Sequence, residues 1–147
     1  MSHSLTRIWI HSVWGIKNRF PFLSDTTRNE IIDHLKIKFD EFGCGVRIIN
    51  GTEDHIYSLF LLNKNDSLKA IMKSIKGESS HWINETNFYK AKFSWQIGYG
   101  AFSVSESLVK KVERYIRNQK EHHKKTSFKE EWDLLIKKHN IIVSGNH

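Results

Sequence analysis

Alternating apolar and polar positions mark the strands of this chain. Residues 5–16 carry apolar side chains at both sets of alternate positions, which is typical of a strand covered on both faces. Residues 46–50 and 54–62 form two further apolar runs, and the short polar turn between them predicts a hairpin. Residues 93–105 are rich in aromatic side chains and predict a fourth strand, with a kink at its glycines.

Helical periodicity fills the intervals between these strands. Residues 27–42 and 68–83 each place their apolar side chains on one stripe. Thr27 and Glu30 form a capping box that predicts the start of the first helix, with Asp25 as a rival cap. The order of elements predicts an α+β fold: a ferredoxin-like split βαβ antiparallel sheet with two helices on one face. The other face then needs a cover, which is a partner, a ligand or the C-terminal part of the chain.

The third predicted strand, residues 54–62, carries an unusual pair of side chains. His55 and Tyr57 point to the same face of this strand, because successive side chains alternate. A histidine beside a phenol at the start of an otherwise apolar strand has two explanations, a solvated strand end or a functional site. The pattern alone leaves both open.

Helix signals resume near Ser105 and Glu106 and predict an additional C-terminal helix, whose stripe begins at Leu108. Its stripe starts apolar and ends polar, with Leu108, Val112, Tyr115, Ile116, Gln119, His122 and His123. Tyr115 and Gln119 lie one turn apart, which places their Cβ atoms about 5–6 Å from each other. The stripe is consistent with two interpretations: Tyr115 belongs to the hydrophobic core, or it belongs to a functional site. Residues 127–136 predict a last short helix, for packing or for a dimer surface.

Length and composition narrow the class of protein. The 147 residues predict one domain, residues 1–147, with a core of about residues 5–125 and a helical extension of about residues 126–147. Cys44 is the only cysteine, which excludes an intrachain disulfide and favours a reducing compartment, the cytoplasm. We expect no signal peptide, and no apolar run is long enough for a membrane span.

Positive charge favours a polyanionic partner. Lys and Arg total 23 against 16 Asp and Glu, a formal net charge of +7, so nucleic acid is the first candidate and an anionic membrane surface the second. Lys69, Lys73 and Lys76 line one side of the second helix, either as a solvated face or as a track for phosphates. Lys120 and Lys124 add positive charge just after Tyr115.

Several segments together resemble one family. Residues 51–57, GTEDHIY, are similar to the strand motif of the single-tyrosine HUH transposases of the insertion sequence 200/605 class, which include REP-associated tyrosine transposases. That motif is a histidine, a bulky apolar residue and a second histidine. Residues 115–125 resemble the family's helix, which carries a nucleophilic tyrosine and a metal-binding glutamine four residues later. Residues 75–77 and 95–103 are also similar, so the likeness runs from about Leu5 to Phe128.

This resemblance implies an activity and a site. Members of the family fold as a split βαβ sheet, form intertwined dimers, and cut and rejoin single-stranded DNA at hairpins. Carried onto this sequence, Tyr115 is the nucleophile that forms a 5′-phosphotyrosine, and His55 and Gln119 are ligands of Mg²⁺ or Mn²⁺. The expected partners are a single-stranded DNA hairpin and a second copy of the chain, with composite active sites and no membrane. Tyr115 acts either in its own subunit or in the partner's site.

One position departs from the family pattern. The second histidine of the strand motif is Tyr57 in this chain. A phenol binds a hard cation weakly, because a free tyrosine has a pKa of about 10 and stays neutral at pH 7. Three outcomes are open: a catalytically impaired DNA-binding relative, a weak enzyme with two protein ligands and water, or an enzyme in which His122 or His123 supplies the missing imidazole. An unrelated split-βαβ protein that binds RNA or another protein is a further alternative, and it predicts no salt-dependent binding to a DNA hairpin.

Overall fold

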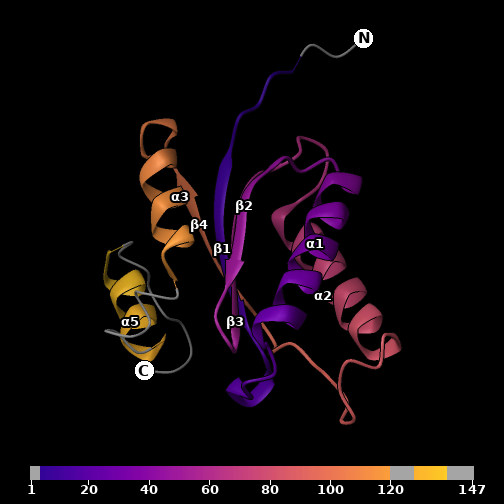
Figure 1. The fold of residues 1–147 in the computed structure, drawn as a ribbon. Coiled ribbons are helices and arrows are strands. Elements are labelled where there is room, and N and C mark those ends of the chain that lie inside the picture. Colours follow the sequence, from indigo (N-terminus) through magenta and orange to yellow (C-terminus); the bar gives the residue numbers. More distant parts are fainter. Residues whose placement is uncertain (1–3, 120–127, 139–147) are drawn as a thin grey trace.

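The computed structural model describes residues 4–119 and 128–138, in which a four-stranded sheet lies between two layers of helices (Figure 1). The strands are β1 (Trp9–Gly15), β2 (Val46–Gly51), β3 (His55–Leu61) and β4 (Gly100–Val104). The helices are α1 (Asp25–Glu41), α2 (Leu68–Glu85), α3 (Val109–Arg117) and α5 (Phe128–Lys138), with 3-10 turns at Lys17–Arg19 and Glu106–Leu108. The strand order is β2-β3-β1-β4 and every pair is antiparallel, which confirms the predicted ferredoxin-like split βαβ fold. No helix among the described residues is long and apolar enough to cross a membrane.

Each face of the sheet has its own hydrophobic cluster. On one face, Trp14 and Phe60 pack with the buried sides of α1 and α2. On the other face, which α3 covers (Figure 1), Tyr57 of β3 packs with Val109 and Ile116. The C-terminal part of the same chain therefore covers the second face, which was one of the three covers that the strand order allowed.

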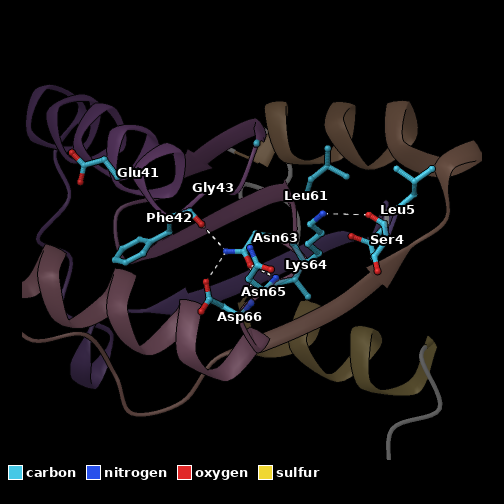
Figure 2. Close-up of a pocket in the computed structure, with 13 residues that line it drawn as sticks. Ser4, Leu5, Glu41, Phe42, Gly43, Leu61, Asn63, Lys64, Asn65 and Asp66 are labelled. Atoms are coloured by element: carbon cyan, nitrogen blue, oxygen red, sulfur yellow. Dashed lines mark hydrogen bonds between the residues drawn. The ribbon is translucent and has the colours of Figure 1, made fainter. Parts of the chain in front are cut away.

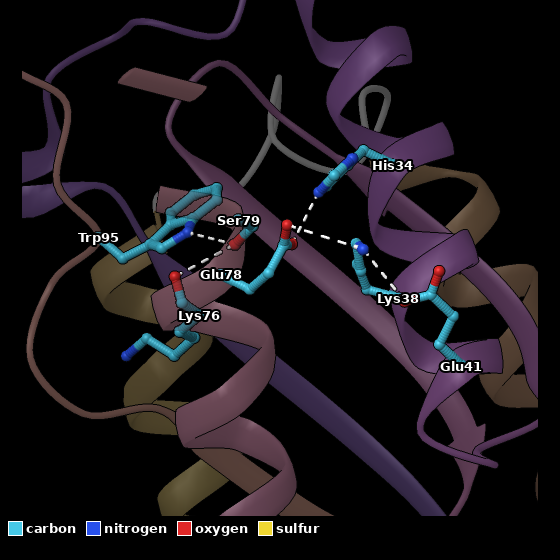
Figure 3. Close-up of polar contacts among 7 residues, drawn as sticks. All are labelled: His34, Lys38, Glu41, Lys76, Glu78, Ser79 and Trp95. Atoms are coloured by element: carbon cyan, nitrogen blue, oxygen red, sulfur yellow. Dashed lines mark hydrogen bonds and ion pairs between the residues drawn. The ribbon is translucent and has the colours of Figure 1, made fainter. Parts of the chain in front are cut away.

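Polar side chains join α1 to α2 within their layer (Figure 3). Glu78 of α2 accepts a hydrogen bond from His34 of α1 at 2.7 Å and lies 3.9 Å from the ammonium group of Lys38. On the inner side of α2, the indole nitrogen of Trp95 donates to Ser79 at 2.9 Å. These bonds tie α2 both to α1 and to the segment that leads into β4.

The first helix begins earlier than its capping box predicts. α1 starts at Asp25, and no side chain caps it, so the predicted cap at Thr27 is wrong. Arg28 donates to the carboxylate of Asp25 and to the carbonyl of Leu23, at 3.0 Å for the second bond. This guanidinium binds the residues around the first turn and so fixes the start of the helix two residues before the box.

The predicted fourth strand is divided at its glycines, as expected. Gly98 has a φ of +89°, a conformation that glycine adopts readily and that turns the chain before β4. Ahead of this turn, Trp95 bridges to Ile16, and the backbone nitrogen of Gln96 donates to the carbonyl of Gly15 at 2.9 Å. The segment before β4 therefore lies at the end of β1, next to the start of β3.

Candidate active site

His55 is the first residue of β3 and is fully buried. Its Nδ1 donates a hydrogen bond to the carboxylate of Asp54 at 2.6 Å. With the proton on Nδ1, the lone pair stays on Nε2, which is the arrangement found in metal-binding histidines whose other nitrogen is held by a carboxylate. Asp54 therefore sets both the tautomer and the orientation of the ring.

Gly15, the cross-strand partner of His55, makes room for this imidazole. A Cβ atom on Gly15 would lie 2.6 Å from His55 Nε2 and 2.5 Å from Gln96 Oε1, closer than real contacts allow. The imidazole and the side chain of Gln96 thus share the space beside one glycine. A second polar side chain, from the segment before β4, is thereby placed at the site.

Replacing Gly15 with alanine is expected to lower the free energy of unfolding by about 1–3 kcal/mol, the usual cost of adding a methyl group to a tightly packed interior. The new Cβ has to displace His55 or Gln96, so the imidazole should move as well. Gly77→Ala is the matched control, because nothing lies within 4 Å of that position on α2 and alanine favours helix by about 0.5–1 kcal/mol. Urea unfolding of both variants measures the difference; equal midpoints would show that Gly15 is not needed for the fit.

Tyr57 lies on the same face of β3 as His55, where the resemblance places a second histidine. Its side chain is fully buried. Burial raises the pKa of the Tyr57 phenol far above its ordinary value, and Glu131, Tyr115 and Asp54 raise this pKa further. The phenol is therefore neutral at physiological pH, and the position offers a hydroxyl in place of an imidazole.

Helix α3 is fixed on the sheet of its own chain. Asn50 of β2 donates to the carbonyl oxygens of Ile116 and Arg117 at 2.8 and 3.1 Å, two of the groups that the C-terminus of a helix leaves unsatisfied. Arg47, also on β2, donates to the Glu113 carboxylate at 2.9 Å. These bonds set the position of the helix that carries the candidate nucleophile.

Tyr115 of α3 packs toward the sheet, and Gln119, two residues after the end of α3, is buried beside it. Burial raises the pKa of the Tyr115 phenol above its ordinary value, hydrogen bonding to Glu131 raises it further, and a hydrogen bond with the side chain of Gln119 lowers it. Gln119 is fully buried, and its Oε1 has no hydrogen-bond partner among the described residues. Tyr115 is thus a protonated phenol at neutral pH, with an amide oxygen available for a ligand beside it.

Two more residues at this site were not expected from the sequence. Glu131 of α5 is only 3% exposed, and its carboxylate interacts with the hydroxyl groups of Tyr57 and Tyr115. His11 of β1 is buried and packs edge-on against the ring of Tyr115, with ring centroids 6.0 Å apart. Both interrupt apolar positions of their elements, and this is the signal that could have identified them.

The structure brings together Tyr57, Tyr115 and Gln119, and His55 lies on the same face of β3 as Tyr57. Four other predicted residues, Lys120, His122, His123 and Lys124, lie outside the described residues. Whether His122 or His123 supplies an imidazole therefore stays a prediction. Within the described ranges, the site is made by β3, α3, α5 and the end of β1.

The three lysines of α2 lie in the opposite helical layer from α3 (Figure 1). Lys69 and Lys73 are exposed. Lys76 is half-buried and donates to the carbonyl oxygens of Gln96, at 2.8 Å, and of Gly98. Burial lowers the pKa of the Lys76 ammonium. Lys76 thus supports the segment before β4, which carries Gln96 beside His55, whereas Lys69 and Lys73 are open to solvent.

A depression in the surface lies at the far end of β3 from His55 (Figure 2). The loop after the strand forms its floor, where Asn63 donates to the Phe42 carbonyl at 2.6 Å and to the Asp66 carboxylate at 2.9 Å. Lys64 at its rim donates to the Ser4 carbonyl at 3.3 Å. This depression is held by internal hydrogen bonds and is separate from the cluster around Tyr115.

Comparison with known proteins identifies the family. Residues 4–119 match the family of IS200-like transposases. The chain belongs to this family. Two solved structures share the fold of this transposase. One is a candidate transposase from Deinococcus radiodurans R1, with a TM-score of 0.65 and 19% identity over 81% of this chain and 95% of that chain. The other is a REP-associated tyrosine transposase bound to a REP hairpin, with a TM-score of 0.60 and 18% identity. That match covers 84% of this chain and 74% of the other chain. No curated protein matches the sequence.

The donors at the site of this transposase can be compared with those that Mg²⁺ and Mn²⁺ prefer. No three His, Cys, Asp or Glu side chains in the described ranges are grouped as a metal site. The site offers instead one imidazole, the amide oxygen of Gln119 and the carboxylate of Glu131, and oxygen donors suit both cations. Leaving a buried oxygen such as Gln119 Oε1 unsatisfied costs about 1–3 kcal/mol, which a bound cation would recover. By the chemical type of its donors, this set suits a divalent cation.

Proposed function

We propose that this transposase cuts and rejoins single-stranded DNA through a covalent bond to Tyr115. One observation carries the proposal: within one chain, α3 and the residues just after it bring Tyr115 and Gln119 to the face of the sheet that bears His55 and Tyr57. His55 and Gln119 would hold Mg²⁺ or Mn²⁺, which would polarise the scissile phosphate and neutralise charge in the transition state. The test is whether the protein forms a covalent adduct with a labelled hairpin, and whether Tyr115→Phe loses that adduct.

The proposed reaction is a transesterification in which Tyr115 replaces a 3′ oxygen on a DNA phosphate. The phenol oxygen forms a bond to phosphorus, the bond from phosphorus to the 3′ oxygen breaks, and a 5′-phosphotyrosine and a free 3′-hydroxyl result. The phenol loses one proton and the leaving oxygen gains one. Because the pKa of Tyr115 is raised, deprotonation has to accompany the attack rather than precede it. The covalent bond conserves the energy that rejoining needs.

A second candidate function is favoured by Tyr57 alone. A buried neutral phenol replaces the second imidazole of the strand motif, and loss of a metal ligand weakens catalysis more than it weakens DNA binding. In that case the protein is a catalytically impaired relative that binds DNA hairpins. Both candidates share the fold and the DNA partner, and they differ only in the covalent step.

The proposed partner is a single-stranded DNA hairpin. Support comes from the net charge of +7 and from the structural neighbour that is bound to a REP hairpin. We further propose that Tyr115 acts in its own subunit, because α3 is bonded to β2 of the same chain. A homodimer is then compatible with activity, but the site does not require residues from a second copy.

Removing the two exposed lysines of α2 tests whether this helix contacts phosphates. If Lys69 and Lys73 each neutralise one phosphate, the double Lys→Ala variant should reduce the slope of log affinity against log salt by about 1.4–1.8. Fluorescence anisotropy with a labelled hairpin at several salt concentrations measures this slope. Lys36→Ala, at an exposed position on α1, is the control. It should change the slope and the affinity by no more than the loss of one positive charge does. An unchanged slope in the double variant would place the DNA elsewhere.

A further inference from the structure

Another depression in the surface lies where the chain leaves the sheet at the end of β1. Its volume is about 400 Å³, within the range of about 300–1,000 Å³ that is usual for small-ligand pockets. The segment after β1 and the segment before β4 both line it, with Lys17, Phe20, Phe22, Lys92 and Ser94 among their residues. The described residues of this lining carry two positive charges and no negative charge, which favours an anionic ligand.

Phe20 presents an aromatic ring at this depression. The residue is 57% exposed, and its ring packs against that of Phe22, with centroids 4.7 Å apart and planes inclined by 30°. Behind it, Phe22 contacts the ring of Tyr89 at 4.6 Å between centroids, and the Tyr89 hydroxyl donates to the Phe22 carbonyl at 2.8 Å. Phe20 is therefore supported from the core side while part of its surface stays open to a ligand.

Backbone hydrogen bonds connect this depression to the candidate active site. The nitrogen of Lys17 donates to the Ser94 carbonyl at 3.0 Å, and the nitrogen of Gln96 donates to the Gly15 carbonyl at 2.9 Å. Side chains alternate along extended chain, so Lys17 lies on the same side as Gly15. Ser94 lies on the same side as Gln96 for the same reason. Gly15 and Gln96 adjoin His55, so one step of two residues, about 6–7 Å, separates the depression from this imidazole's neighbours.

We infer that this depression binds one unpaired nucleotide of the DNA strand that passes the candidate active site. The base stacks on Phe20, and the exposed ammonium groups of Lys17 and Lys92 contact the phosphates beside it. This inference rests on the proposed function, which supplies single-stranded DNA as the ligand. Aromatic rings next to basic side chains hold single-stranded nucleic acid in this way, and stacking accepts any base. The depression would thus position the strand beside His55 without selecting a sequence.

Binding of a tailed hairpin by the full chain tests this assignment. Fluorescence anisotropy in EDTA compares a labelled blunt hairpin with the same hairpin carrying unpaired thymidines at its 5′ or its 3′ end. One of the tails should tighten binding by the wild type, and Phe20→Ala should weaken binding of that tailed hairpin by about 5–150-fold. Affinity for the blunt hairpin should stay the same. Thermal unfolding shows whether each variant is folded.

Two further variants separate stacking from a general loss of apolar surface. Phe20→Tyr keeps an aromatic ring and should retain the gain from the tail. Ile37→Ala is the matched control, because Ile37 on α1 is also 57% exposed and lies outside the depression. Its binding of both hairpins should equal that of the wild type.

The two lysines are tested through the salt dependence of the tailed hairpin. Each contact between a lysine and a phosphate of a single strand contributes about 0.7 to the slope of log affinity against log salt. The double variant Lys17→Ala with Lys92→Ala should therefore reduce that slope by about 1.4. The slope for the blunt hairpin should not change, since neither lysine contacts its duplex.

A photochemical cross-link locates the base in the unmodified protein, so this measurement does not depend on the stability of a variant. A tail that carries 5-iodouracil in place of thymine forms a covalent bond, under ultraviolet light, with an aromatic ring in contact with the base. Mass spectrometry of the digested product should place this bond on Phe20.

The outcomes distinguish this inference from the proposed function. Loss of the gain from the tail in Phe20→Ala, with retention in Phe20→Tyr and Ile37→Ala, supports it. Equal affinity of the wild type for blunt and tailed hairpins, equal losses in Phe20→Ala and Ile37→Ala, or a cross-link at a distant residue overturns it. Absence of a covalent adduct in Mn²⁺, with binding that still depends on the tail and on Phe20, removes only the cleavage activity. Absence of all hairpin binding contradicts both.

Discussion

Replacing Tyr115 with phenylalanine should abolish covalent attachment of DNA while leaving hairpin binding intact. The variant keeps the ring that packs against His11 and loses only the hydroxyl group that would attack the phosphate. Because a phenyl ring has no nucleophilic oxygen, the adduct should fall by at least about a thousandfold. Denaturing gel electrophoresis with a 5′-labelled or 3′-labelled hairpin, in Mn²⁺, measures the adduct and shows which DNA end is attached.

Two comparisons make this result specific. Tyr99→Phe removes a hydroxyl from another partly buried tyrosine and should leave the adduct unchanged. A mixture of Tyr115→Phe with His55→Ala should give no more adduct than the sum of the two alone, because we place both residues in one chain. Recovery of activity in the mixture would mean that the tyrosine acts in the partner subunit. An adduct that persists in Tyr115→Phe would remove this residue as the nucleophile.

Tyr57→His should increase Mn²⁺-dependent cleavage by about 10–100-fold, which is the usual range for a change in the shell around a metal. The substitution restores the second imidazole of the strand motif on the face that already carries His55. A neutral imidazole binds a divalent cation at neutral pH, whereas the Tyr57 phenol has a pKa raised far above the working range. Cleavage of a labelled hairpin under single-turnover conditions measures the gain.

Tyr57→Phe controls for the change in packing. It retains the buried ring and removes the hydroxyl without adding a metal ligand, so it should give no gain. The control is needed because a histidine is smaller than a tyrosine and leaves space between the sheet and α3. If the histidine and phenylalanine variants behave alike, the strand position does not limit catalysis, and the proposal of an impaired relative loses its physical basis.

The sequence predicted the framework of this site because local patterns determine it. Alternation along residues 54–62 placed His55 and Tyr57 on one face, and helical spacing placed Tyr115 and Gln119 on one side of the predicted C-terminal helix. The α-helix starts later than the helix signals near Ser105 and Glu106: residues Glu106–Leu108 form a 3-10 turn in which Leu108 is 48% exposed, and α3 begins at the buried Val109. The point where the turn becomes an α-helix depends on packing against the sheet, which periodicity does not include.

The sequence did not predict the parts of the site that depend on long-range packing. Glu131 is 76 residues after His55, and no spacing rule relates α5 to β3. The crowding at Gly15, which accommodates both His55 and Gln96, also joins segments that are distant along the chain. The sequence does show a charged residue, Glu131, within an apolar helical stripe and a glycine, Gly15, at the end of a strand. Their roles at the site become clear only from the three-dimensional arrangement.

The most direct test of this account is a crystal structure of the protein with Mn²⁺, in which anomalous scattering locates the metal. The account predicts one Mn²⁺ ion bonded to Nε2 of His55 and Oε1 of Gln119 of the same chain, with the hydroxyl of Tyr115 beside it and open to a phosphate. A metal bound elsewhere, or a Tyr115 hydroxyl that stays sealed away from the ion, would contradict the central claim that one chain assembles a complete DNA-cleaving site.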